Sequence, residues 1–241
     1  MAVKVFTDFD GTITTQDVGN AFFRTYVRGD YDALLDDYLA ERISAAECFR
    51  RGAQAIGAVD RDAVMAFFRQ QPVDPTFAGF VTFCRTRGLD LAIVSDGLDA
   101  YINAILDEHH IETVPVYANT LTWVPAEAPG LSTVGISFPF ADATCTRCAC
   151  SKRNILLTCA GDEDIIVYIG EGYSDRCPVQ YADIVFAKDQ LQRFCQEKNI
   201  SYYLYSSFAD VQTRMEGLLG KARLRKRRQA ESMRRDAFLR E

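Results

Sequence analysis

Two aspartates one residue apart are the first side chains in this sequence whose types and spacing could do chemistry. Asp8 and Asp10 follow the alternating apolar run of residues 3–7 and precede Gly11. Residues i and i+2 of an extended chain point the same way, so the two carboxylates can face one small volume. Such a pair suits a divalent cation, or a nucleophile that works beside an acid and base. The alternative is an acidic turn with Asp10 and Gly11 at its corner.

A hydroxyl residue ends a second predicted strand. The apolar run of residues 89–94 is followed by Ser95, Asp96 and Gly97, the same layout as at the first strand. The carboxyl ends of parallel strands form the edge at which open α/β sheets bind ligands, so we expect Ser95 near the first aspartate pair. The alternative is a turn that caps a helix over residues 98–106.

An acidic loop follows the strongest strand pattern in the chain. Residues 164–169 are rich in β-branched side chains, and the glycine-containing loop after them carries Glu171 and Asp175. Together with the first aspartate pair, these carboxylates would make an oxygen-rich site suited to Mg²⁺. The alternative is a polar turn in which Ser174 or Asp175 caps the next helix.

Lys152 opens a predicted helix over residues 153–159, although a helix N-terminus disfavours positive charge. A lysine in this position usually projects into water. The mismatch is expected where an anion is bound at the same place. Lys152 is therefore a candidate ligand for an anion.

Three cysteines, Cys145, Cys148 and Cys150, lie just before this lysine. They could begin a zinc site with Cys177, but a closed tetrahedral site commonly uses a second paired element, which this chain does not show. A redox pair or a packing cluster is the favoured interpretation. The other cysteines are expected to be small buried hydrophobes in the reduced state.

The strand and helix patterns place these residues in an α/β fold. Residues 17–72 show apolar positions at helical spacing and no evident strand, with Ser44 and Glu47 forming a capping-box pattern. We therefore predict a core domain of residues 1–16 and 73–220, built on a parallel sheet with helices on both faces. Residues 17–72 are predicted to be a helical insertion.

The middle of the chain is harder to interpret. Residues 114–119 are predicted to be a further strand, with Pro115 near its start. Residues 120–141 contain several prolines and glycines and are predicted to be irregular. A small β excursion within them is the alternative.

Size and composition are those of an ordinary globular protein. The 241 residues are 48% hydrophobic and 25% charged. The sequence contains no run of about 18 consecutive apolar residues, which is the length expected of a transmembrane helix. The chain also goes directly into a strand rather than a signal segment. We expect a cytoplasmic protein with no membrane partner.

The formal net charge of −6 is unevenly distributed. Residues 221–241 hold nine Lys or Arg residues against three acidic ones, so the rest of the chain is strongly acidic. An acidic body argues against a nucleic-acid binder, whose affinity comes from neutralising phosphates. The basic tail has too few apolar residues to bury a face and is predicted to be a solvated or frayed helix. A weak contact with RNA, a membrane or an acidic partner is the alternative.

The order of these motifs resembles a known family. Asp8-Phe9-Asp10-Gly11-Thr12 is similar to the Asp-x-Asp-Gly-Thr motif of the haloacid-dehalogenase-like phosphatases. The resemblance implies a Rossmann-like core with a helical cap, Mg²⁺ as cofactor and a small-molecule phosphomonoester as substrate. Asp8 would become the aspartyl-phosphate and Asp10 would act as general acid and base.

The resemblance also implies roles for the later motifs. Thr12, Ser95, Asp96, Gly97 and Lys152 would bind the phosphate, and Asp8, Asp10, Glu171 and Asp175 would hold the metal. The family usually has aspartate where Glu171 stands, which leaves open whether this side chain binds the metal directly or through water.

Within the superfamily, the chain resembles the phosphoserine phosphatase branch. The helical insertion, and the cysteines before Lys152, are similar to two groups, the methionine-salvage enol-phosphate phosphatases and the phosphoethanolamine/phosphocholine phosphatases. If the substrate is phosphoserine, Arg50 or Arg51 could hold its carboxylate, although an exposed arginine pair on a helix is usually just solvated. The alternative function is a binding or regulatory protein with little turnover.

Overall fold

The computed structural model describes residues 1–143, 148–220 and 224–239. Its strands are β1 (Val3–Thr7), β2 (Val59–Asp60), β3 (Asp90–Leu98), β4 (Val116–Pro125), β5 (Leu131–Ser137), β6 (Ile165–Gly170), β7 (Ile184–Ala187) and β8 (Tyr203–Leu204). Within the described ranges these strands form a single sheet in the order β2-β5-β4-β3-β1-β6-β7-β8. The neighbouring strands β4, β3, β1, β6, β7 and β8 pair in parallel. Phe6 of β1 is aligned with Ala92 of β3 and with Tyr168 of β6. The predicted parallel sheet is confirmed.

Helices separate most of the strands. They are α1 (Val18–Tyr26), α2 (Tyr31–Leu39), α3 (Ala45–Ile56), α4 (Arg61–Arg69), α5 (Phe77–Thr86), α6 (Asp99–Glu108), α7 (Lys152–Cys159), α8 (Asp189–Glu197), α9 (Phe208–Leu219) and α10 (Arg228–Phe238). Two short 3₁₀ turns, η1 (Ser174–Arg176) and η2 (Pro178–Gln180), follow β6. Among these described elements, none is a helix long and apolar enough to cross a membrane.

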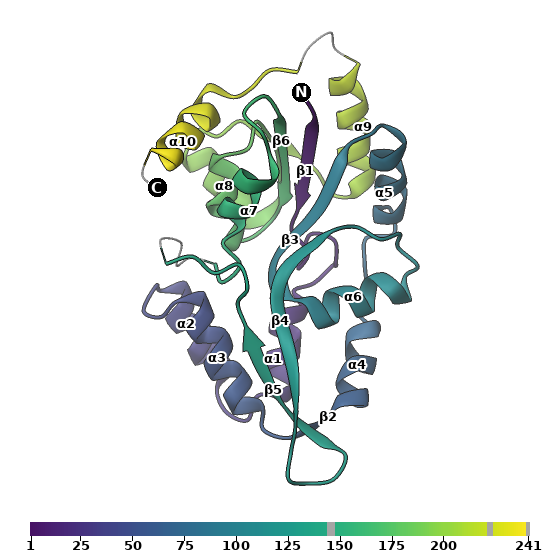
Figure 1. The fold of residues 1–241 in the computed structure, drawn as a ribbon, viewed down its shortest axis with the longest axis vertical. Coiled ribbons are helices and arrows are strands. Elements are labelled where there is room, and N and C mark those ends of the chain that lie inside the picture. The colour runs from purple at the N-terminus through teal and green to yellow at the C-terminus, as the bar shows by residue number, and fades with distance from the viewer. Residues whose placement is uncertain (144–147, 221–223, 240–241) are drawn as a thin grey trace.

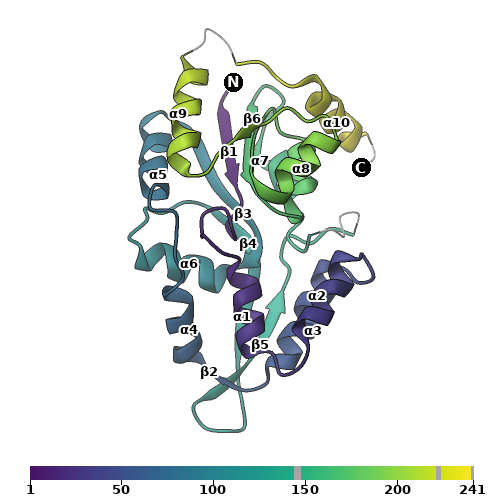
Figure 2. The ribbon, with the colours of Figure 1, turned by 180° about the vertical axis from the view of Figure 1, so that it is seen from behind.

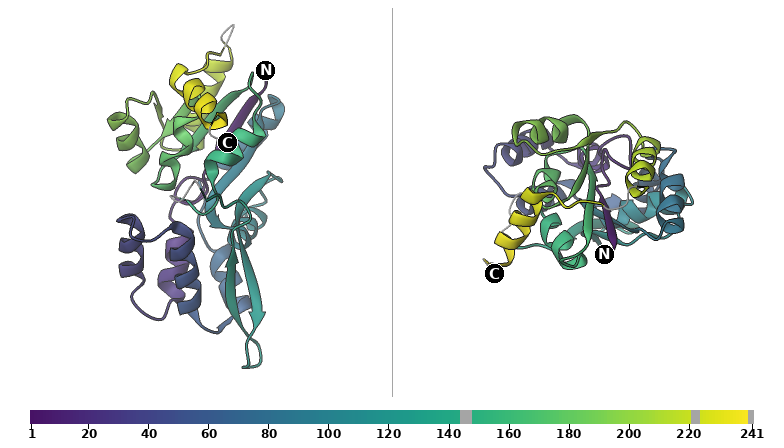
Figure 3. Two further views of the ribbon diagram at one scale, coloured as in Figure 1. Left: turned by 60° about the vertical axis from the view of Figure 1, so that its left-hand side comes forward. Right: turned by 90° about the horizontal axis from the view of Figure 1, so that it is seen from above.

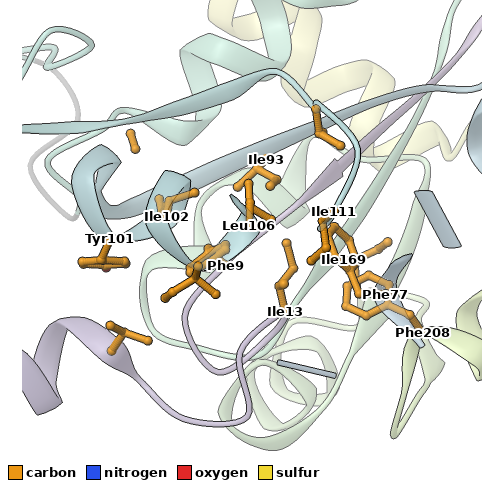
Figure 4. Packing of buried hydrophobic residues seen from close by; sticks show 14 of the residues in the cluster. Phe9, Ile13, Phe77, Ile93, Tyr101, Ile102, Leu106, Ile111, Ile169 and Phe208 are labelled. Carbon is orange, nitrogen blue, oxygen red and sulfur yellow. The ribbon is translucent and has the colours of Figure 1, made fainter. Parts of the chain in front are cut away.

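Alternate residues of the central strands pack into two separate apolar clusters, one on each face of the sheet. Val5 of β1 faces a cluster with α5, α6 and α9, whereas Phe6 faces a cluster with α7 and α8. In Figure 1, α5 and α9 accordingly lie on one side of β1 and β6, and α7 and α8 on the other. Helices thus cover both faces of the sheet, as the sequence predicts. Figure 4 shows the first cluster from close by, where Phe77 and Phe208 from two helices meet.

The segment of residues 17–72, here called the cap segment, holds α1 to α4. Figure 2 shows α1 leaving the loop after β1 and passing between α4 and the α2–α3 pair. The side chain of Ser44 accepts a hydrogen bond from Glu47 N at 3.2 Å, so the predicted N-cap of α3 is present. The rings of Phe22 and Phe68 pack 5.1 Å apart and join α1 to α4.

The cap segment is not purely helical, and the expectation of no strand there is wrong. Its two-residue strand β2 pairs antiparallel with β5, which pairs antiparallel with β4. Because the first residues of β4 pair in parallel with β3, one sheet continues from the core into the cap segment. Figure 3 shows β4 and β5 running together away from the core alongside the cap helices.

The basic tail is also more ordered than the sequence predicts. Ala230 on α10 is fully buried. Arg234 forms an ion pair with Asp183 at 3.0 Å, and Arg227 donates hydrogen bonds to the carbonyls of Val179 and Gln180. The predicted helix is present, and most of its described side chains are exposed or partly exposed, but Ala230 and Arg234 attach it to the core, so it is not fully solvated. Residues 221–223 and 240–241 of the predicted tail lie outside the described residues.

Candidate functional site

Asp8, Lys152 and Asp175 form a buried ion cluster at the carboxyl edge of the sheet. Lys152 Nζ lies 2.8 Å from Asp8 Oδ1 and 2.8 Å from Asp175 Oδ1. The Lys152 and Asp175 side chains have no solvent exposure, and that of Asp8 has 7%. Burial opposes the charge on Lys152, but the two carboxylates outweigh it and raise the lysine pKa. The lysine is therefore held as a cation between two acidic groups.

Both carboxylate oxygens of Asp175 accept hydrogen bonds from the protein. Oδ1 accepts from Lys152 and from the Tyr168 hydroxyl at 2.6 Å, and Oδ2 accepts from the backbone N–H groups of Glu171 and Gly172. Although burial opposes its ionisation, Lys152 and these donors lower the pKa of Asp175. Asp175 therefore holds Lys152 and the loop after β6 in place.

Asp8 is engaged on one oxygen only. Its Oδ1 accepts from Phe9 N at 2.8 Å and contacts Lys152, whereas Oδ2 receives no hydrogen bond from the described residues. Burial and the charge of Asp175 raise the pKa of Asp8, and Lys152 opposes this shift. One carboxylate oxygen is therefore fixed and the other is free to meet a ligand.

The loop before α7 sets the position of Lys152. Ser151, immediately before the helix, has a left-handed conformation with φ of 44°. Asp96 Oδ1 accepts from the backbone N–H groups of Ala149 and Cys150 at 2.6 and 3.0 Å. The β3 strand thereby fastens the segment that delivers the lysine to the site.

Asp10 is held from two sides. Its Oδ1 accepts from Val18 N and Gly19 N, at the start of α1, and its Oδ2 accepts from the Tyr101 hydroxyl at 2.5 Å. Burial, and then repulsion from Asp17, raise the pKa of Asp10 to about 7. A carboxyl group with such a pKa can both give and take a proton near neutral pH.

A cavity of ≈ 290 Å³ opens above these carboxylates. Five acidic side chains line it: Asp8, Asp10, Asp17, Asp96 and Glu171. Its outer wall is mostly apolar or aromatic and comes from the cap segment: Phe23, Tyr31, Leu35, Tyr38, Leu39, Ala45, Cys48 and Phe49. Among the described residues that line it, none is Lys, Arg or His. The cavity therefore combines an acidic floor with an uncharged wall.

The cap segment and the core touch across the cavity mouth. The Tyr173 hydroxyl donates to Glu41 Oε1 at 2.8 Å, and the rings of Tyr38 and Tyr173 meet edge to face at 5.6 Å. Both tyrosines line the cavity. Core and cap segment thus enclose the same volume.

Several predicted site residues do not line this cavity. Thr12 and Ser95 are buried behind the loops. Ser95 Oγ accepts from Gly97 N and donates to Asp10 Oδ2 at 3.4 Å. Because β3 continues to Leu98, the serine lies within the strand rather than after its end. Arg50 and Arg51 are half-exposed on α3 and pair with Glu47.

The donor set fits a hard divalent cation. Asp8 Oδ2 and the Glu171 carboxylate accept no hydrogen bond from the described residues, and both groups line the cavity. Burial, and then the charges of Asp175 and Asp17, raise the pKa of Glu171 to about 7, so a cation here would relieve repulsion. The described residues hold no group of three acidic, histidine or cysteine side chains that could bind a metal unaided. Mg²⁺ usually keeps several waters and uses one or two carboxylates together with substrate phosphate, so it does not need such a group.

The cysteines contribute no metal site within the described part of the chain. Cys148 and Cys150 are buried, and Cys150 Sγ contacts the carbonyl of Tyr117. Cys145 lies outside the described residues.

Sequence reasoning missed Tyr101, Tyr168 and Asp17. The tyrosines lie within apolar helix and strand patterns that predict only burial, and nothing local marks their hydroxyls as partners of distant carboxylates. Asp17 has a local explanation as the N-cap of α1, where it accepts from Asn20 N. Each local pattern therefore has an ordinary structural explanation, and its contact with the site is not apparent from the sequence.

Comparison with known proteins gives one matching family and a consistent set of relatives. The family described as Putative Phosphatase matches residues 3–201. The 2-hydroxy-3-keto-5-methylthiopentenyl-1-phosphate phosphatase of Geobacillus kaustophilus is 32% identical over 86% of this chain and 92% of its own length. The enzyme of the same name from Geobacillus thermodenitrificans is 30% identical over 89% of this chain and 96% of its own length.

Solved structures share the fold at lower identity. A phosphoserine phosphatase solved as a phospho-aspartyl intermediate analogue superposes with a TM-score of 0.66 at 15% identity, covering 88% of this chain and 98% of that one. A haloacid-dehalogenase family hydrolase from Salmonella enterica serovar Typhi gives a TM-score of 0.67 at 17% identity, covering 88% of this chain and 70% of that one.

Proposed function

Because the chain belongs to the putative-phosphatase family and is a phosphoric monoester hydrolase with the fold of a haloacid-dehalogenase family hydrolase, we propose that Asp8 is its nucleophile and Asp10 its general acid and base. The observation that carries this proposal is the state of Asp8 at the cavity floor. Lys152 and Phe9 N fix one of its oxygens, and the other has no partner among the described residues. A fixed carboxylate with one free oxygen is prepared for in-line attack on phosphorus.

The proposed reaction has two steps. In the first, Asp8 Oδ2 attacks phosphorus while Asp10 gives its proton to the leaving alkoxide, so an alcohol departs and an aspartyl-phosphate remains. In the second, Asp10 takes a proton from water as the water oxygen attacks phosphorus, which releases inorganic phosphate and restores the Asp8 carboxylate. Lys152 stays cationic throughout, and offsets negative charge beside the phosphoryl group.

Mg²⁺ is the proposed cofactor. Glu171 would hold it at the cavity floor that it shares with Asp8, whose Oδ2 is left to attack phosphorus, and it would supply positive charge against the phosphoryl oxygens. Asp10 and Asp175 were also predicted as ligands, but the side-chain oxygens of both accept hydrogen bonds from protein donors. Asp175 is better placed to act through Lys152.

The cavity wall favours a substrate whose leaving group carries no negative charge. A carboxylate such as that of phosphoserine would meet acidic side chains, and no cationic side chain among the described residues lines the cavity. The methylthio enol phosphate named for the Geobacillus relatives has an apolar end that suits Phe23, Leu35 and Phe49. We therefore propose a phosphomonoester of this kind as the substrate.

A phosphoethanolamine or phosphocholine substrate is the second candidate. Asp17, Tyr31 and Tyr38 all line the cavity, and a carboxylate with aromatic rings can hold an ammonium group. These two candidates differ in the charge of the leaving group, so a substrate panel separates them.

The test is hydrolysis of a panel of small phosphomonoesters by the full chain with Mg²⁺, with and without EDTA. The panel contains the methylthio enol phosphate, phosphocholine, phosphoethanolamine, phosphoserine and benzyl phosphate. We expect turnover that EDTA abolishes and that Asp8→Asn lowers by at least about 10⁴-fold with an unchanged melting temperature. Normal turnover by Asp8→Asn would refute the nucleophile assignment. Negligible turnover of the whole panel by folded, Mg²⁺-loaded protein would favour the alternative of a binding or regulatory protein.

A further inference from the structure

Tyr101 reaches the proposed acid/base carboxylate from α6, where the core packs against α4 of the cap segment. It lies in the first turn of α6, fully buried, and its ring packs 6.0 Å from that of Phe9 and 5.5 Å from that of Phe68. Figure 4 shows the Tyr101 and Phe9 side chains next to each other at the end of the apolar cluster. Apolar packing therefore fixes the ring and leaves the hydroxyl as its only polar group.

That hydroxyl meets Asp10 in a space kept open by glycine. Tyr101 OH lies 2.5 Å from Asp10 Oδ2. A Cβ atom placed on Gly97 would overlap the hydroxyl and would lie 2.5 Å from Asp10 Oδ2, and one on Gly19 would lie 3.4 Å from the hydroxyl. Glycine at both positions thus leaves room for the contact between the tyrosine hydroxyl and the aspartate.

The two oxygens of Asp10 have partners of different kinds. Oδ1 faces the N–H groups of Val18 and Gly19, which can only donate. Oδ2 faces the hydroxyls of Tyr101 and Ser95, which can both donate and accept. When Asp10 carries a proton, that proton therefore belongs on Oδ2, and the Tyr101 hydroxyl can turn to suit either form.

We propose that Tyr101 is a positioning residue that fixes the plane of the Asp10 carboxylate, so that Oδ2 is aimed at the leaving-group oxygen of the ester. The proposal rests on the proposed acid/base role of Asp10. The N–H groups of α1 hold one carboxylate oxygen and the Tyr101 hydroxyl holds the other, so the carboxylate cannot rotate about its Cβ–Cγ bond. Without the hydroxyl, Ser95 at 3.4 Å is too distant to hold Oδ2 alone.

The test compares two esters that differ in their need for a proton donor. Benzyl phosphate releases an alkoxide that must be protonated, whereas para-nitrophenyl phosphate releases a stable phenolate that needs little help. The quantity measured is kcat/KM, which covers binding and the departure of the alcohol but not the later attack of water. Tyr101→Phe keeps the ring and removes only the hydroxyl.

We expect Tyr101→Phe to lower kcat/KM for benzyl phosphate by about 10- to 100-fold and for para-nitrophenyl phosphate by less than about threefold. The control is Tyr117→Phe, whose hydroxyl contacts Cys159 outside the cavity and whose loss should change neither value. Equal losses on the two esters, or no loss on benzyl phosphate, would overturn the proposal. Failure of the proposed function would be seen separately, as turnover retained by Asp8→Asn.

Discussion

The floor and the wall of the cavity are built from opposite kinds of interaction. At the floor, Asp8 is held by Lys152, which also pairs with Asp175; the Lys152 and Asp175 side chains are buried behind the cavity lining, and both ion pairs measure 2.8 Å. At the wall, the cap segment presents aromatic and aliphatic side chains with no ion pair to the core among the described contacts. Charge-assisted hydrogen bonds require a particular geometry, whereas apolar contacts tolerate substitutions of similar volume. The floor is therefore suited to one reaction, and the wall to the choice of substrate.

Removing the cation of the ion cluster should have the largest effect on stability, because its charges are buried. Lys152→Met leaves two carboxylates close together with no cation, and should lower the free energy of unfolding by about 3–5 kcal/mol. Lys4→Met removes an ion pair of the same 2.8 Å length, between Lys4 and Asp90, whose side chains are 24% and 61% exposed. That variant should change the free energy by less than about 1 kcal/mol. Urea denaturation in EDTA measures both, and similar small changes in the two variants would show that burial does not distinguish the floor.

The floor could be predicted from the sequence because each of its parts has a local pattern. The run before Asp8 and the β-branched run of β6 are long enough to indicate buried strands, and the carboxyl ends of parallel strands meet at one edge. Lys152 was detectable because its charge conflicts with a helix N-terminus. Three local signals that converge on one sheet edge are sufficient to bring these side chains together, but not to indicate that Asp175 pairs with Lys152.

The wall and the outer sheet could not be predicted in the same way. β4 ends at Pro125, β5 contains Gly135, and both strands are only partly buried, so their alternation is weak, and β2 has two residues. The contact of α10 with Asp183, and that of Tyr101 with Asp10, join residues about 50 and 91 positions apart. Such contacts depend on tertiary packing, which no short-range periodicity contains.

A second prediction concerns Glu171, another acidic residue of the cavity floor, and the pH dependence of stability. The folded state raises the pKa of Glu171 from 4.5 to about 7. The folded protein therefore binds this proton more tightly than the unfolded chain. Its stability falls as the pH rises through this interval, and the full penalty is present above the folded pKa. In EDTA at about pH 8, Glu171→Gln should then be more stable than the unchanged protein by about 1–3 kcal/mol, and at about pH 4 the two should be equal.

Denaturation curves at the two pH values measure this difference. Glu163→Gln is the matched control, because the Glu163 side chain is 83% exposed and its contact with Lys226, at 3.8 Å, is a surface ion pair, so this variant should change the stability by less than about 1 kcal/mol. Added Mg²⁺ should reverse the order at about pH 8, since a bound cation stabilises the carboxylate form. Equal stability of Glu171→Gln and the unchanged protein at about pH 8 in EDTA would contradict the repulsion inferred at the floor.

The smallest effects are expected at the wall. Leu35 lines the cavity and touches no reacting group, so Leu35→Ala should raise KM for benzyl phosphate by about 3- to 10-fold and leave kcat unchanged. Arg51 pairs with Glu47 on α3 and does not line the cavity, so Arg51→Ala should change KM by less than about twofold. Steady-state kinetics on the same ester measures both variants. A larger rise in KM for Arg51→Ala than for Leu35→Ala would mean that the arginine binds the substrate after all, and that charge rather than apolar contact governs the wall.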